Sequence, residues 1–402
     1  MTGVTDLLEQ IAGIGRVGAS GGYRRFAWTR EDALLREWFA GTAAGLGLEV
    51  VEDRVGNQWA WWGDPDSAPG IVTGSHLDSV PDGGAYDGPL GVASSLAAVA
   101  ALRDSGFVPS RPLAVTNFVD EEGARFGVAC SGSRVLSGAM SADRALGLRD
   151  GDGVTMAEAL VSAGRDPHQV GRDDEALARV GTFVELHVEQ GRLLGDLDAD
   201  TPVAVGSSIW PHGRWRFDLL GEANHAGTTR LEDRRDPMLA LAELVTSARS
   251  IAARLGCVAT VGKVEVRPNG VNAIPSSVSG WLDARGPDED DVRRLVPLLE
   301  QSVGVSAVEE SFTPDTRFDA DLSQELAGLL GGVPIVGTGA GHDAGVLATR
   351  GFRTAMLFVR NPTGVSHSPA EHAEPEDCEA GVAALVATLR HLASGAEAVP
   401  AP

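Results

Sequence analysis

The 402-residue chain has little positive charge and no long apolar run. Its 33 Lys and Arg residues stand against 56 Asp and Glu, which gives a formal net charge of −23 at pH 7. This charge repels phosphate backbones and anionic lipid surfaces, because affinity for either begins with basic side chains. No stretch approaches the roughly 18 to 20 unbroken apolar residues of a membrane helix. We therefore expect neither nucleic acid nor a membrane as a partner.

Cysteine is also scarce. Cys130, Cys257 and Cys378 are odd in number and widely separated, so they form neither a disulfide framework nor a Cys-x-x-Cys metal site. The N-terminal residues lack the basic start, apolar middle and small-residue cleavage site of a secretory signal. We expect reduced thiols and a cytoplasmic location.

The pattern of apolar residues predicts an α/β fold. Short buried strands are expected at 71–73, 113–119, 182–186 and 355–359, with helices at 29–48 and 87–102. Strands that alternate with helices imply a mainly parallel sheet, and ligands bind beyond the carboxyl ends of such strands. The segment 150–174 and the tail after residue 394 are the expected disordered stretches.

The middle of the chain has a different order of expected strands and helices. Between about 208 and 314 the order of expected elements is strand 214–220, helix 235–255, strands 258–266 and 277–284, helix 289–301 and strand 305–312. This order is βαββαβ, which is typical of a ferredoxin-like domain. We predict a catalytic domain in two parts, 1–207 and 317–402, with an inserted dimerisation or lid domain at 208–316.

Imidazole and carboxylate side chains follow several of the expected strands. This mixture fits Zn, Mn, Co or Ni, and two such ions about 3.5 to 4 Å apart usually share a bridging carboxylate. Asp87, which lies among glycines, is the natural bridge, and Asp78 could hold the other ring nitrogen of the nearby histidine. The predicted metal ligands are His76, Asp87, Glu122, His187 and His367.

Glu121 and Glu122 are adjacent at the end of a strand, so their side chains point differently. One can bind a metal while the other remains free to take a proton from water. We predict Glu121 as the general base.

Seven motifs carry a resemblance to a known family. They are GSHLDSVPDGGAYDGPLGV at 74–92, DEEGARFG at 120–127, ELHVEQG at 185–191, GEANHAGTTR at 221–230, RPNGVNAIPSSV at 267–278, GAGHDAG at 339–345 and GVSHSPAEH at 364–372. Over almost its whole length the chain resembles the M20 metallopeptidase-like family. The resemblance is to its amidase (hydantoinase/carbamoylase) branch of allantoate amidohydrolases, N-carbamoyl-L-amino acid hydrolases and β-ureidopropionases.

The resemblance implies how the ligands are divided between two metal ions. One ion would be held by His76, Asp87 and His187, and the other by Asp87, Glu122 and His367. It also implies that Glu121 is the catalytic acid/base.

The resemblance further implies that the inserted domain contacts substrate through His225, Asn272 and Arg285 and mediates formation of a homodimer. Gln190 and His342 are weaker candidates for substrate contact. The alternatives for these two are a buried hydrogen-bonding amide and an imidazole that structures a loop.

The expected function is hydrolysis of the C–N bond of a ureido or N-carbamoyl carboxylate. An aminoacylase or dipeptidase of the same family, an N-formyl or N-formimino amino acid hydrolase, and a binding protein without metals are the alternatives. The sequence departs from the branch at Arg230, where proline is usual, and an extra cation there would favour a second carboxylate on the substrate.

Overall fold

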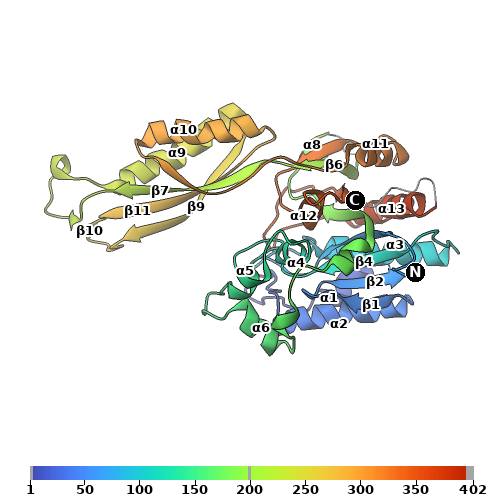
Figure 1. Cartoon of the computed structure of the whole chain (residues 1–402). Coiled ribbons are helices and arrows are strands. Elements are labelled where there is room, and N and C mark those ends of the chain that lie inside the picture. Colours follow the sequence, from blue (N-terminus) through green and yellow to red (C-terminus); the bar gives the residue numbers. More distant parts are fainter. Residues whose placement is uncertain (1–2, 198–200, 395–402) are drawn as a thin grey trace. The chain divides into compact units, whose positions relative to one another are not determined.

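A computed structural model describes residues 3–197 and 201–394, and it divides into two compact units (Figure 1). The first unit comprises 1–207, 317–336 and 341–402, and the second comprises 208–316 and 337–340. The predicted tail after residue 394 lies outside the described residues. None of the helices that the structure describes is both long and apolar enough to cross a bilayer.

The first unit is built on a mixed nine-stranded sheet, in the order β1-β2-β4-β3-β5-β15-β6-β13 with β14 beside β6. Its centre is parallel, since β3 pairs in parallel with β4 and β5, and β5 with β15. The strands are β1 Glu49–Glu52, β2 Gln58–Trp62, β3 Gly70–His76, β4 Leu113–Phe118, β5 Val180–Val188, β6 Val203–Ile209, β13 Thr316–Arg317, β14 Ile335–Thr338 and β15 Arg353–Val359. The carboxyl ends of β4, β3, β5 and β15 therefore meet at one edge.

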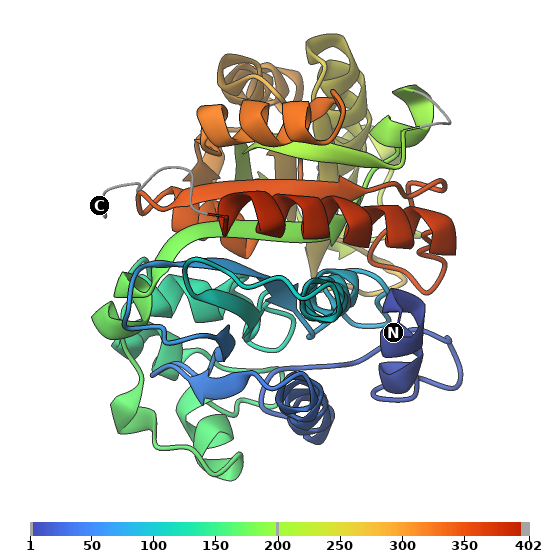
Figure 2. The ribbon, with the colours of Figure 1, turned by 90° about the vertical axis from the view of Figure 1, so that its right-hand side faces the viewer.

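Helices cover this sheet with apolar faces. The helix α13 runs alongside β15, as Figure 2 shows, and it packs against α3. Small residues fill α3, which begins at Pro89, a favoured first helical residue because its fixed φ suits a helix. The helices are α1 Val4–Ile11, α2 Arg30–Gly45, α3 Pro89–Asp104, α4 Ser131–Leu136, α5 Ala142–Gly147, α6 Met156–Ser162, η1 Pro167–Gln169, α7 Asp174–Ala178, α8 Leu193–Leu197, α11 Ala320–Leu329, α12 Asp343–Ala348 and α13 Pro375–Leu392.

The second unit has its own hydrophobic core between a four-stranded antiparallel sheet and two helices. The sheet order is β12-β7-β11-β9, as expected for βαββαβ connectivity. The elements are β7 His212–Leu220, β8 Asn224–His225, η2 Leu231–Asp233, α9 Pro237–Leu255, β9 Val258–Arg267, β10 Ala273–Ile274, β11 Ser277–Arg285, α10 Glu289–Val303 and β12 Ala307–Thr313. The segment Gly337–Ala340 also belongs to this unit, and in it the Thr338 carbonyl accepts the Trp210 amide at 2.8 Å.

The predicted fold class is confirmed, and two local expectations need correction. His76 and His187 lie inside the last residues of β3 and β5, whereas both strands were expected to end before them. The expected disorder at 150–174 is wrong. A capping box at α6, in which Thr155 and Glu158 bond reciprocally, gives part of this polar stretch a regular structure.

Candidate metal centre

The predicted metal ligands come from segments that are far apart in the sequence and meet at the carboxyl edge of the parallel strands. His76 ends β3, His187 lies near the end of β5, and Glu122 follows β4. Asp87 lies just before α3, and His367 lies in the loop after β15. The structure brings these five residues into two overlapping groups, which are His76 with Asp87 and His187, and Asp87 with Glu122 and His367.

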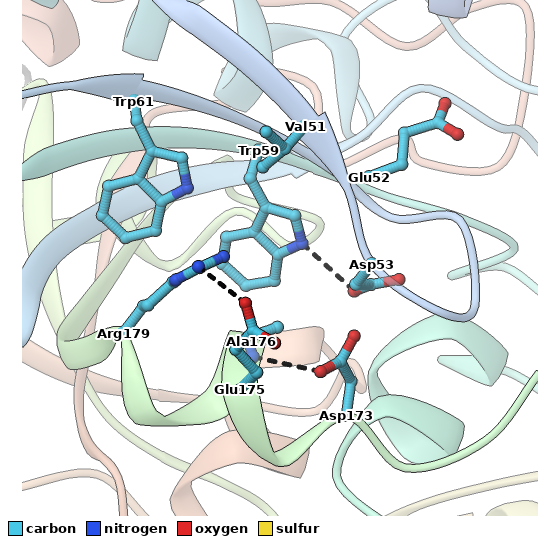
Figure 3. A pocket seen from close by; sticks show the side chains of 9 residues that line it. All are labelled: Val51, Glu52, Asp53, Trp59, Trp61, Asp173, Glu175, Ala176 and Arg179. Atoms are coloured by element: carbon cyan, nitrogen blue, oxygen red, sulfur yellow. Dashed lines mark hydrogen bonds and ion pairs between the residues drawn. The ribbon is translucent and has the colours of Figure 1, made fainter. Parts of the chain in front are cut away.

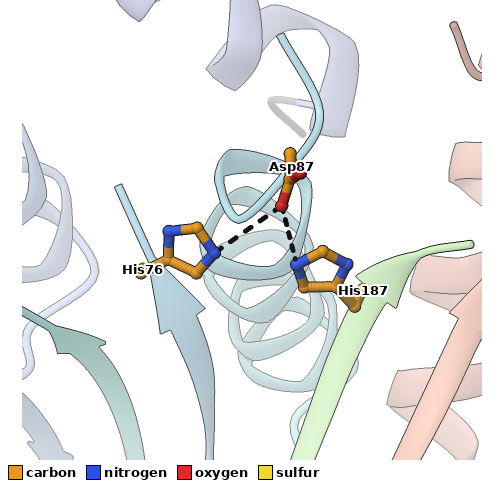
Figure 4. Close-up of side chains that lie close together, drawn as sticks. All are labelled: His76, Asp87 and His187. Atoms are coloured by element: carbon orange, nitrogen blue, oxygen red, sulfur yellow. Dashed lines mark ion pairs between the residues drawn. The ribbon is translucent and has the colours of Figure 1, made fainter. Parts of the chain in front are cut away.

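Asp87 turns one carboxylate oxygen to each group. Its Oδ1 lies 3.3 Å from His187 Nε2 and 3.8 Å from His76 Nε2 (Figure 4). Its Oδ2 lies 3.3 Å from His367 Nε2, which is 3.6 Å from Glu122 Oε2. Donor atoms that share a tetrahedral ion with bonds of about 2.0–2.2 Å are separated by roughly 3.3–3.6 Å. The spacing of these side chains fits divalent cations.

The hydrogen bonding of the two buried histidines supports this fit. The Nδ1 atoms face backbone carbonyls, that of Asp78 at 3.2 Å from His76 and that of Val188 at 2.8 Å from His187. An Nδ1–H donor leaves the Nε2 lone pair available to a metal. Both Nε2 atoms and Glu122 Oε1 are buried and have no hydrogen-bond partner among the described residues. A bound cation would give these atoms a partner.

Glu121 and Glu122 are aimed by Asp78 and by an unusual backbone turn. The two oxygens of Asp78 accept the Glu121 and Glu122 amides at 3.1 and 3.0 Å. Asp120 has a φ of 56°, a left-handed conformation that is uncommon for a residue with a side chain. Glu121 Oε2 lies 3.7 Å from His76 Nε2, so this carboxylate borders the metal cluster without belonging to either three-residue group.

Two carboxyl groups and one imidazole of this cluster have raised pKa values. Burial raises the pKa of Glu121 well above its usual range. Burial, together with the charge of Asp87, raises the pKa of Glu122 to about 7. A hydrogen bond with Asp87 raises the pKa of His367 to about 9. Several carboxylates buried close together favour the binding of a positive charge, either a proton or a metal ion.

Gln190 and His342 lie beside the cluster. Gln190 Nε2 donates to Asp87 Oδ2 at 2.9 Å, which is the hydrogen-bonding role proposed as its alternative. His342 is buried with its ring 4.5 Å from that of His187. Neither ring nitrogen of His342 has a partner among the described residues, so it remains open to a ligand. Glu185, His187 and His342 form a further group of donor atoms.

Three predicted substrate contacts belong to the second unit. His225 in β8 pairs with β10, and the Ala226 amide donates to the Asn272 carbonyl at 3.0 Å, so the two segments are neighbours. His225 Nδ1 accepts the Gly227 amide at 2.9 Å, which leaves Nε2 free at an exposed position.

Arg285 lies at the far end of β11 from that pair. It binds Asp283 with two hydrogen bonds, of 2.7 and 3.1 Å, and Gly339 with a third of 2.8 Å. Two of its five N–H donors therefore remain for a ligand. From Ser277, the start of β11, to Arg285 are eight residue steps, and at roughly 3.3 Å per step the two ends lie about 26 Å apart. The structure does not bring Arg285 together with His225 and Asn272 of the same chain.

A separate pocket of about 190 Å³ lies away from this chemistry (Figure 3). Its lining is Val51, Glu52, Asp53, Trp59, Trp61, Asp173, Glu175, Ala176 and Arg179. None of the predicted site residues is among these described lining residues. Polar groups of the lining bond to one another, and Trp59 Nε1 donates to Asp53 at 3.1 Å. The cavity therefore lies apart from the predicted site residues.

One residue of the site escaped the sequence analysis. Glu371 is buried, and it accepts the amides of Tyr86 and Asp87 at 2.9 and 3.0 Å. It lies in the quoted motif GVSHSPAEH, four residues after His367. Its presence in that motif was the only available indication, because the bonds join segments more than 280 residues apart.

Comparison with known proteins agrees with this geometry. The model of peptidase family M20/M25/M40 matches residues 72–391. An N-carbamoyl-L-amino acid amidohydrolase of Geobacillus stearothermophilus is 36% identical over 97% of this chain and 98% of its own. The allantoate amidohydrolase of Bacillus subtilis is 32% identical over 97% of both chains. The crystal structure of a hydantoinase/carbamoylase family amidase from Burkholderia vietnamiensis has a TM-score of 0.84 and 30% identity, over 98% of this chain and 97% of its own.

Proposed function

This chain belongs to peptidase family M20/M25/M40, and from that premise we propose that it is a metal-dependent amidohydrolase of ureido or N-carbamoyl carboxylates. The observation that carries the proposal is the divided Asp87 carboxylate, whose oxygens lie 3.3 Å from His187 on one side and 3.3 Å from His367 on the other. A bridging carboxylate between two sets of imidazole and carboxylate donors is typical of dinuclear hydrolases.

The proposed ligands form two sets that share Asp87. His76, Asp87 and His187 would hold one ion, and Asp87, Glu122 and His367 the other. Zn, Mn, Co and Ni all suit these donors. When bound, such ions act as Lewis acids that polarise a carbonyl and make water more acidic.

Glu121 is the proposed general base. Its Oε1 accepts the thiol of Cys130 at 3.4 Å, which leaves Oε2 directed toward His76 and the cluster. Oε2 takes a proton from the attacking water and returns it to the leaving nitrogen. Burial raises the pKa of this carboxyl well above its usual range, which makes its ionised form a stronger base.

The substrate class follows from the relatives and from the second unit. Relatives of this chain are named N-carbamoyl-L-amino acid amidohydrolase and allantoate amidohydrolase, so the proposed scissile bond is the C–N bond of a ureido group. Arg285 would bind the substrate carboxylate with its two remaining donors, and His225 and Asn272 would steady the oxyanion.

These contacts favour a homodimer with shared sites. A small carboxylate cannot span the roughly 26 Å between Arg285 and the His225 end of β11 in one chain. The strand β9 is an exposed edge of the second sheet, and such edges tend to pair with another copy. We infer that the second unit mediates the dimer and that His225 and Asn272 serve the site of the partner.

An aminoacylase or dipeptidase activity, or hydrolysis of N-formyl or N-formimino amino acids, is the alternative.

The charge of Arg230 is already matched by Asp233 at 2.9 Å and Glu232 at 3.3 Å, so the preference for a second substrate carboxylate remains a prediction. Comparing mono- and dicarboxylate substrates in Arg230→Ala would test it.

A substrate panel with measured metal content tests the main proposal. We expect about two divalent ions per chain, and release of ammonia from N-carbamoyl amino acids or allantoate. Faster hydrolysis of N-acyl amino acids or dipeptides would replace the substrate class and keep the metal centre. Failure to bind any first-row divalent ion would overturn the proposal itself.

A further inference from the structure

The carboxylate of Glu371 joins two loops that are distant in the sequence. Its Oε2 accepts the amides of Tyr86 and Asp87, and its Oε1 accepts the hydroxyl of Ser366 at 3.1 Å. It is only 6% exposed. One buried side chain therefore binds the backbone of the loop that carries Asp87 and the Ser366 side chain of the loop that carries His367.

The fit around this carboxylate is tight. A Cβ added to Gly84 would lie 2.2 Å from Glu371 Oε2 and 2.5 Å from its Cβ, so the loop before Asp87 closes directly onto Glu371. The Ser366 hydroxyl lies 3.1 Å from Glu371 Oε1 and also 3.1 Å from Asp87 Oδ2. Its single proton is shared between the two carboxylates.

The two backbone amides can only donate, so a side-chain oxygen must face them. The Ser366 hydroxyl can donate or accept, so a glutamine could keep all three bonds, with its oxygen on the amides and its NH₂ group on Ser366. An alanine would remove all three bonds and leave the two buried amides without a partner, which is costly.

We propose that Glu371 is a positioning residue that fixes Asp87 relative to His367, and so sets how tightly the second ion is held between them. The inference rests on the proposed function, because it assumes that these two residues bind metal. The residue touches neither substrate nor the reacting atoms, so its influence passes through the placement of the Asp87 carboxylate.

Glu371→Ala tests the proposal when the full-length protein, stripped of metal, is titrated with Co²⁺ and followed by calorimetry and visible absorption. We expect the ion held by Asp87, Glu122 and His367 to bind about 10- to 100-fold less tightly, with a changed cobalt spectrum, whereas Glu371→Gln should keep most of that affinity. Glu376→Ala, at an exposed position in the first turn of α13, is the matched control and should titrate like the wild type. A role in folding alone would lower the Tm of the metal-free protein and leave affinity and spectrum unchanged, and that result overturns the proposal.

Ser366→Ala provides a second route in case Glu371→Ala does not fold. It removes the hydroxyl between the two carboxylates, and a smaller loss of affinity for the same ion is expected. Unchanged cobalt binding in Ser366→Ala together with an unfolded Glu371→Ala also rejects the inference. A wild-type protein that binds no cobalt would instead reject the proposed function, so the two failures are distinguishable.

Discussion

Glu121 and Glu122 are neighbours in sequence with carboxylates that face different partners. Glu122 lies 3.6 Å from His367, whereas Glu121 accepts a hydrogen bond from Cys130. We therefore expect Glu121→Gln to lower kcat by about 10²- to 10⁴-fold, the usual contribution of a general base, while metal content stays at the wild-type level.

Glu122→Gln is the variant to compare with Glu121→Gln. We expect Glu122→Gln to bind less metal and to lose activity as a consequence. Steady-state kinetics and elemental analysis of both proteins separate the two roles. Wild-type kcat in Glu121→Gln, or loss of metal from it, contradicts the assignment of Glu121 as the base.

Gly88 is required where the chain passes His76. Its φ is 85°, and an added Cβ would lie 2.4 to 2.6 Å from three atoms of the His76 ring. Gly88→Ala should lose about 1–3 kcal/mol of stability through its backbone conformation, and metal affinity through displacement of the ring. Gly153→Ala is a matched control with a φ of 83° in open space.

Thermal unfolding and metal titration of these two glycine variants measure both effects. We expect lower stability in both and weaker metal binding only in Gly88→Ala. Equal metal affinity in the two variants would show that the His76 ring tolerates the methyl group.

At the residue scale, the sequence predicts site residues that directly follow an apolar strand pattern. It does not predict residues whose role depends on contacts with distant parts of the chain. His76 and Glu122 were found because an apolar run precedes each of them and parallel strands end at one edge. Glu371 was missed, because its partners Tyr86 and Asp87 are more than 280 residues away. No local pattern encodes such a bond.

At the scale of the single element, β11 places Asp283 and Arg285 on one face, since residues two apart in a strand point the same way. Burial opposes ionisation of Asp283, but the hydrogen bonds and charge of Arg285 outweigh it and lower the pKa of Asp283. Because the pKa of Asp283 is lower in the folded state, its ionisation stabilises the folded protein at pH values above the unfolded-state pKa of about 3.9. This stabilisation is lost as the pH falls through the folded-state pKa.

We therefore expect the Tm of the wild type to fall more steeply below about pH 4 than that of Asp283→Asn, which has no such carboxylate to protonate. Scanning calorimetry from neutral to acidic pH provides the two curves. Parallel curves would mean that the pair with Arg285 contributes nothing to the acid sensitivity of the second unit.

Elements were predicted best where periodicity is strong. The βαββαβ order of the second unit follows from alternation in its strands and from long amphipathic helices, such as α10. The polar segment 150–174 was expected to be disordered because it is acidic. It instead contains α6, whose N-terminal end is fixed by the capping box of Thr155 and Glu158. Charge alone does not exclude local order.

At the scale of the whole molecule, the second unit is an insertion whose two ends meet. The Phe318 amide donates to the Ser207 carbonyl at 3.0 Å, so the residues that flank it are hydrogen-bonded neighbours. The boundaries predicted at 208 and 316 rest on the change in the pattern of expected elements there. The separation of Arg285 from His225 is not encoded locally, because it depends on Arg285 ending β11 while β8, which carries His225, lies near the other end of that strand.

That distance leads to a prediction about mixed dimers. Glu121→Gln and His225→Ala should each be inactive as homodimers. If His225 acts on the partner chain, a mixed dimer contains one site with an intact base and an intact histidine. Random exchange at equal amounts makes half of the dimers mixed, so activity should return to about a quarter of the wild-type value.

If His225 acts within its own chain, each site of the mixed dimer lacks one of the two groups and no activity returns. The measurement is the rate of ammonia release after the two purified variants are mixed, dissociated and reassociated, with each variant alone carried through the same treatment. Sedimentation must show dimers throughout. If no activity returns in proven mixed dimers, His225 does not act on the partner chain. Arg285 and His225 of one chain would then have to act on different substrates or in different steps, because they lie near opposite ends of β11, which are roughly 26 Å apart.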